Sequence, residues 1–184
     1  MQIAEFQRII RVTDKTTIVR RIILERGCEM LSPEIENNLC GAVSKRFDVD
    51  EENIHIVGSA KLGFSIKPKS RYQAFHDDSD IDLAIADPSL FERVWTEVHA
   101  YVQTGEFWEK EREFYGYLQN GWIRPDLLPN ANSFDFTTTW WNYFNALTAS
   151  GRFGRYPIRG AIYMNRFFLE TYQTICVEQC QRGT

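Results

Sequence analysis

Residues 76–85 read His-Asp-Asp-Ser-Asp-Ile-Asp-Leu-Ala-Ile. From Asp80 onward, acidic and apolar side chains alternate with the two-residue period of a β-strand, so Asp80 and Asp82 share one face. Two carboxylates held side by side repel each other unless a proton or a cation neutralises them. Aspartate oxygens suit Mg²⁺ and Mn²⁺, and Mg²⁺ usually takes one or two carboxylates and completes its shell with waters and substrate phosphates. The stretch therefore predicts a strand over 81–86 that carries a divalent metal site.

A second motif lies upstream of the carboxylates. Residues 54–57 are apolar enough for a short strand, and this strand leads into Gly58 and Ser59. A glycine after a strand lets the backbone approach a phosphate closely, and a serine adds a hydroxyl. A Gly-Ser pair alone is common in turns. The order strand, Gly-Ser, apolar strand with Asp-x-Asp is much more specific.

The two motifs together, Val57-Gly58-Ser59 and Ser79-Asp80-Ile81-Asp82-Leu83, resemble the signature of the polymerase β-like nucleotidyltransferase superfamily. The resemblance covers roughly residues 54–86. It implies an α/β (α+β) fold, a mixed β-sheet core with flanking helices that holds metal and triphosphate at the sheet edge. It also implies that Asp80 and Asp82 are catalytic residues and ligands of Mg²⁺ or Mn²⁺, and that the substrate is a nucleoside triphosphate.

The chain departs from the compact form of this signature in its spacer, which places Asp80 22 positions after Gly58. The excess length is a polar loop over 66–78 with a cluster of basic residues. This loop could reach a triphosphate or an acceptor, although charge runs are usually solvated. The residues predicted to bind the nucleotide are Gly58, Ser59, Lys61, Lys67, Lys69 and Arg71.

The third carboxylate is the second departure, since active relatives supply it from a later strand. The predicted last strand, residues 158–163, contains none. Asp135 is the best substitute, because aromatic neighbours alternate with it as on a short strand, and it is predicted as a catalytic residue and metal ligand. It could equally cap the helix that follows. Asp126 is a weaker candidate, because a turn aspartate explains it well.

The chain as a whole predicts one domain over 1–184, with N-terminal helices in 1–50 packed on a catalytic core and C-terminal helices in 51–184. Its 184 residues, 43% of them hydrophobic, can bury one core. Capping residues, prolines and helical periodicity predict most of the helices. The first expected helix is capped at 13–14 and ends at Gly27, the second covers 33–47, and the third runs from Pro88 through Val98. Further helices are expected over 107–118, 138–147 and 166–179.

Net charge and apolar patterning bear on partners and compartment. A net charge of −4 gives no general attraction to nucleic acid. No apolar run approaches the ~20 residues that cross a bilayer, and the first residues lack a signal layout. The four cysteines show no CxxC spacing, so we expect reduced thiols. We therefore expect a cytoplasmic protein without membrane contact.

The leading functional hypothesis is Mg²⁺-dependent, template-free transfer of NMP or dNMP from a nucleoside triphosphate to a hydroxyl. The resemblance leaves the acceptor open among a short nucleotide oligomer, an RNA and a protein. It also implies a bacterial antiviral or toxin–antitoxin system with a partner effector or toxin protein. One alternative is a catalytically degenerate module that binds a partner protein or a nucleotide, which the missing third carboxylate favours. Another is a metal-dependent hydrolase.

Overall fold

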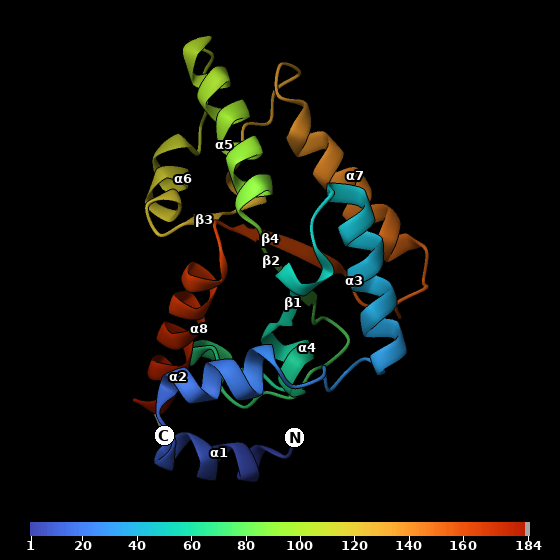
Figure 1. Ribbon diagram of the computed structural model, residues 1–184, viewed down its shortest axis with the longest axis vertical. Coiled ribbons are helices and arrows are strands. Elements are labelled where there is room, and N and C mark those ends of the chain that lie inside the picture. The colour runs from blue at the N-terminus through green and yellow to red at the C-terminus, as the bar shows by residue number, and fades with distance from the viewer. Residues whose placement is uncertain (183–184) are drawn as a thin grey trace.

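A mixed β-sheet crosses the middle of the protein, with helices on both of its faces (Figure 1). The computed structural model describes residues 1–182. Its sheet has four strands in the order β1-β2-β4-β3. This architecture confirms the predicted mixed α/β class. The strands are β1 (Ile54–Val57), β2 (Ile81–Ala86), β3 (Trp122–Ile123) and β4 (Ile158–Tyr163).

The strand register brings the two sequence motifs together. β1 runs antiparallel to β2, and Val57 at the end of β1 pairs with Asp82 near the start of β2. Gly58, the next residue, therefore lies beside the carboxylate strand. β4 runs parallel to β2 on its other side and places Arg159 opposite Asp82.

One face of the sheet is covered by α3 (Pro33–Phe47), α5 (Pro88–Gln103) and α7 (Asp135–Ala149). Their apolar side chains pack on Ile56, Leu83 and Ile162 in one large hydrophobic cluster. The cluster needs a glycine at position 160, because a Cβ there would lie 2.6 Å from the rings of Trp140 and Phe144. A further helix, α6 (Glu111–Leu118), packs beside β3.

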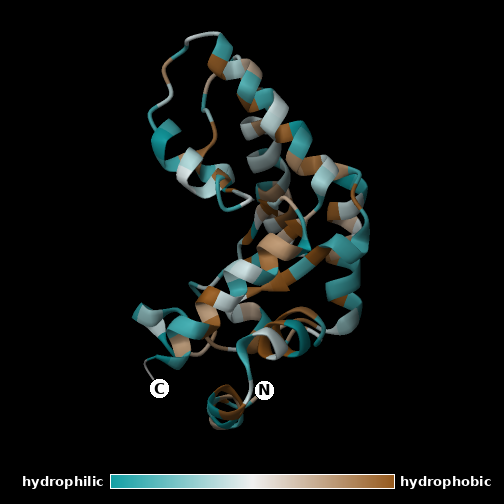
Figure 2. Cartoon of the chain, turned by 60° about the vertical axis from the view of Figure 1, so that its left-hand side comes forward, coloured by the Kyte–Doolittle hydropathy of each residue, from teal (hydrophilic) through white to brown (hydrophobic). Residues whose placement is uncertain are grey.

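The other face carries the N-terminal helices and the last helix. These are α1 (Ile3–Val12), α2 (Lys15–Ile18) continuing into the π-helix η1 (Val19–Leu24), α4 (Gly58–Leu62) and α8 (Arg166–Gln181). Phe6, Ile18, Ala84 and Leu169 share a second hydrophobic cluster there. Figure 2 shows hydrophobic colouring along the central strands and hydrophilic colouring on the outward turns of the helices.

Helix starts follow the capping signals in the sequence. Side-chain oxygens of Asp14, Ser32 and Asp87 accept hydrogen bonds from backbone N–H groups three residues on, at 2.9, 3.3 and 2.8 Å. Such caps satisfy donors that have no partner within the helix. The predictions of helices from Pro33 and Pro88 and after Arg166 are confirmed. No helix of residues 1–182 is long and apolar enough to cross a membrane.

Two expectations need correction, and two elements were not predicted. Asp135 is the first residue of α7, which starts three positions before the predicted Thr138, so the short strand proposed around it is wrong. A carboxylate in the first helical turn is favoured by the helix dipole, which explains this residue without a strand. α6 begins at Glu111 and not at Phe107. Helix α1 and strand β3 were not predicted, and β3 is only two residues long.

Candidate functional site

A cavity of about 540 Å³ opens beside the start of β2. This volume lies within the range of small-molecule sites, about 300–1,000 Å³. The ends of β1 and β2, the loop over 64–80, β4 and one face of α8 form its walls. Its polar lining includes Ser59, Ser65, Lys67, Ser70, Ser79, Asp80, Asp82, Arg124, Arg159, Tyr172, Gln173 and Cys176.

Gly58 and Asp82 are in close contact at the edge of this cavity. Gly58 has φ +71°, a left-handed conformation that side chains with a Cβ rarely adopt. A Cβ built on Gly58 would lie 2.7 Å from Asp82 Oδ2. Only a residue without a side chain lets the chain turn from β1 into α4 this close to the carboxylate.

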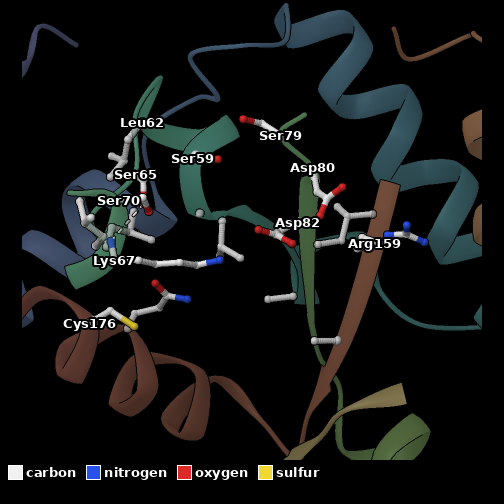
Figure 3. A pocket seen from close by; sticks show the side chains of 18 of the residues that line it. Ser59, Leu62, Ser65, Lys67, Ser70, Ser79, Asp80, Asp82, Arg159 and Cys176 are labelled. Carbon is white, nitrogen blue, oxygen red and sulfur yellow. Dashed lines mark hydrogen bonds between the residues drawn. The ribbon is translucent and has the colours of Figure 1, made fainter. Parts of the chain in front are cut away.

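Burial and neighbouring charges set the ionisation of Asp82. The pKa of this carboxyl is raised to about 6, mainly by burial and also by the neighbouring Asp80, against the lowering effect of Lys67 and Arg159. Figure 3 shows the Lys67 side chain extending across the cavity toward Asp82, with Arg159 on the other side of the carboxylate. Two carboxylates that need a neutralising charge and face an open cavity form a site for a cation.

The residues present fit one Mg²⁺ or Mn²⁺ ion. Asp80 directly precedes β2 and, like Asp82, is half-buried and lines the cavity. Mg²⁺ is commonly held by one or two carboxylates, with waters and phosphates completing its shell. Within residues 1–182, no group of three His, Cys, Asp or Glu side chains lies close enough to hold a metal ion. A protein-built three-carboxylate centre is therefore not formed.

The structure does not bring Asp135 to Asp80 and Asp82. Asp135 is exposed at the start of α7 and lies near Glu97 of α5. The pKa of Glu97 is raised by burial and by the charge of Asp135. It is absent from the cavity lining, so the structure does not place it where a third ligand beside Asp80 and Asp82 would be needed. Asp126 is no substitute, because it also lies outside the lining and pairs with Arg124 at 2.6 Å.

Among the predicted nucleotide-binding residues, Gly58, Ser59 and Lys67 line the cavity and three basic residues do not. Lys61 is only 4% exposed, and its Nζ lies 3.8 Å from Glu36 Oε1 on α3, so the lysine forms an ion pair inside the protein. Arg71 donates a hydrogen bond to the carbonyl of Gln179, 3.2 Å away, and thereby ties the loop to α8. Lys69 is exposed outside the lining. The structure therefore does not bring these three residues to the cavity.

Sequence reasoning missed the wall opposite the carboxylates. Tyr172, Gln173 and Cys176 line the cavity from α8, and Trp122 lines it from β3. Positions 172, 173 and 176 share one face of a helix, which the 3.6-residue period could have shown. Nothing in the sequence indicates that this face lies across from Asp82, because α8 packs on β2 through contacts between segments far apart in the chain.

Comparison with protein-family models gives no match for this chain, and comparisons with curated proteins and with solved structures give none either. The likeness to the nucleotidyltransferase signature therefore rests on its own residues. Of these, Gly58, Ser59, Asp80 and Asp82 lie at one cavity.

Proposed function

We propose that this protein transfers a nucleoside monophosphate from a nucleoside triphosphate to a hydroxyl acceptor, without a template. The observation that carries the proposal is the convergence of Asp80 and Asp82 with Gly58 at a cavity of about 540 Å³. Phosphoryl transfer needs little covalent chemistry from the protein and depends on positioning and electrostatics. A cavity with paired carboxylates, serine hydroxyls and a lysine has groups for both tasks.

Five residues of the lining have a task in this proposal. Asp80 and Asp82 would hold the Mg²⁺ or Mn²⁺ ion, which when bound lowers the pKa of an acceptor hydroxyl and offsets phosphate charge. Ser59 donates its hydroxyl to a terminal phosphate oxygen, and the absence of a side chain at Gly58 leaves Asp82 room to face the metal. Lys67 reaches into the cavity from its loop and pairs with the phosphate charge.

The acceptor is proposed to be a short nucleotide oligomer, an RNA or a protein, in the cytoplasm. The signature, as a resemblance, supports placing the enzyme in a bacterial antiviral or toxin–antitoxin system with an effector or toxin as partner. Incubation with and without the protein encoded beside it tests this part separately from the chemistry.

The test of the activity is pyrophosphate release from each of the labelled NTPs and dNTPs with Mg²⁺ or Mn²⁺, together with a labelled product. Asp80→Ala and Asp82→Ala should abolish release. Asp135→Ala is the matched control, because this exposed aspartate lies outside the cavity, and it should keep full activity. Loss of activity in the control alone would refute the site. Failure with every triphosphate would refute the enzyme.

A second candidate function is nucleotide or partner binding without transfer. The observation that favours it is Arg159, which stands opposite Asp82 on the neighbouring strand, where no carboxylate is present. The positive charge of this arginine partly neutralises Asp82, so the carboxylate depends less on a metal ion for neutralisation. Triphosphate binding by the purified chain without pyrophosphate release, with every metal and acceptor tested, would favour this candidate.

A further inference from the structure

Gln173 is a polar residue buried at the cavity without a partner. It belongs to α8 and is only 5% exposed. Its side chain lines the cavity, and no hydrogen bond joins its amide to another group of residues 1–182. The amide atoms are not enclosed like the buried, unpartnered Nε1 of Trp122, so they are open to the cavity. A ligand in the cavity can therefore hydrogen-bond to this amide.

Aromatic rings line the same cavity as Gln173. The ring of Trp122 lies 4.5 Å from that of Tyr172 and 5.5 Å from that of Tyr163, measured between centroids. Trp122 and Tyr163 are stacked, with 11° between their planes. All three residues line the cavity. Such rings offer contact area to a flat ligand, and stacking on aromatic side chains is the common way to hold a base.

The carboxylate site is within electrostatic reach of this wall. Burial raises the pKa of Tyr172 well above its usual range, and the nearby charge of Asp82 contributes. Lys67 lies between the two, since its charge lowers the pKa of Asp82 and also acts on Cys176. Figure 3 shows Lys67 crossing the cavity with Cys176 on one side of it and Asp82 ahead of it. One ligand with phosphates and a planar ring can therefore span from Asp82 to α8.

We propose that Gln173 sets the base preference of this site by hydrogen-bonding the edge of a nucleobase that lies against Trp122 and Tyr172. The proposal rests on the proposed function for the triphosphate and adds the subsite for its base. An amide carries one acceptor and donors side by side, a pattern that pairs with the amino group and ring nitrogen of adenine. ATP is therefore the expected preferred nucleotide.

The test compares two probes, ATP and inorganic triphosphate, each with Mg²⁺, by isothermal titration. Gln173→Leu should weaken ATP binding about tenfold, the value of one or two lost hydrogen bonds, and should leave inorganic triphosphate binding unchanged. Gln179→Leu is the matched control, the same change at an exposed position of the same helix, and should alter neither. Gln173→Met serves the same purpose if the leucine variant fails to fold.

Three outcomes would overturn the proposal: equal losses for ATP and inorganic triphosphate, no loss for either, or a wild-type protein that binds ATP no better than inorganic triphosphate. A wild-type preference for another base over ATP would overturn the choice of adenine. If the proposed function fails and the base subsite is real, the result is different: ATP binds in a Gln173-dependent way, but no pyrophosphate is released.

Discussion

Gly58→Ala tests whether the approach of Gly58 to Asp82 is a structural requirement of the site. The substitution has two costs that the structure separates. A Cβ at φ +71° costs about 1–2 kcal/mol, as for any side chain in the left-handed region. The same Cβ would lie 2.7 Å from Asp82 Oδ2, so the carboxylate must leave its position, at about 1 kcal/mol for an off-rotamer side chain.

Gly105→Ala is the matched control. Gly105 has φ +72°, and a Cβ there would have nothing within 4 Å. It should therefore show the backbone cost without the contact. The expected losses in free energy of unfolding are about 1–2 kcal/mol for Gly105→Ala and about 2–3 kcal/mol for Gly58→Ala. Urea unfolding followed by circular dichroism measures both, and each kcal/mol corresponds to about 2–4 °C in Tm.

A double-mutant cycle assigns the extra cost to Asp82. In an Asp82→Ala background the carboxylate is gone, so Gly58→Ala should cost no more than Gly105→Ala. Gly58→Ala should also weaken Mg²⁺ binding, while Gly105→Ala should not. The reasoning is refuted if the two alanine variants differ by less than about 0.5 kcal/mol, the usual error of additivity, or if the cycle shows no coupling.

Three further changes test other parts of the fold. Burial lowers the pKa of His55 from 6.5 to about 4, so between these pH values the unfolded chain binds a proton that the folded protein does not bind. The free energy of unfolding should therefore fall by about 3 kcal/mol as the pH drops from 6.5 to 4. His55→Gln should reduce this dependence of stability on pH. Glu36→Ala leaves the buried Lys61 without its carboxylate and should cost about 3 kcal/mol, whereas the exposed Glu34→Ala on the same helix should cost almost nothing; equal losses would contradict the pair. Gly160→Ala forces two aromatic rings of α7 to move and should cost about 1–3 kcal/mol in urea unfolding; an unchanged midpoint would refute this packing.

Much of the local structure could be predicted from the sequence. The carboxylate strand, the strand that leads into Gly58, and the helices from Pro33 and Pro88 follow from short-range signals: alternation, caps and prolines. α1 was missed although Ile3, Phe6 and Ile10 recur at helical spacing, whereas β3 gave no comparable signal. β3 is two residues long and exists because β4 pairs with it, which is a long-range event.

The candidate site was only half predictable for the same reason. Gly58, Ser59, Asp80 and Asp82 carry their chemistry in a motif. The short strand expected around Asp135 did not form, because an aspartate between aromatic residues fits a strand or a helix start, and only the packing of α7 decides between them. The basic residues could not be separated either, since Lys61 and Lys67 differ in what surrounds them and not in type.

The carboxylate pair, the Gly-Ser motif and the strands that carry them follow from local sequence, because these features depend on neighbours a few positions apart. What faces the carboxylates depends on packing between distant segments. The parallel pairing of β2 with β4 puts Arg159 opposite Asp82, and the packing of α8 brings Gln173 to the same cavity. Those contacts join residues 77 and 91 positions apart, and no local pattern specifies them.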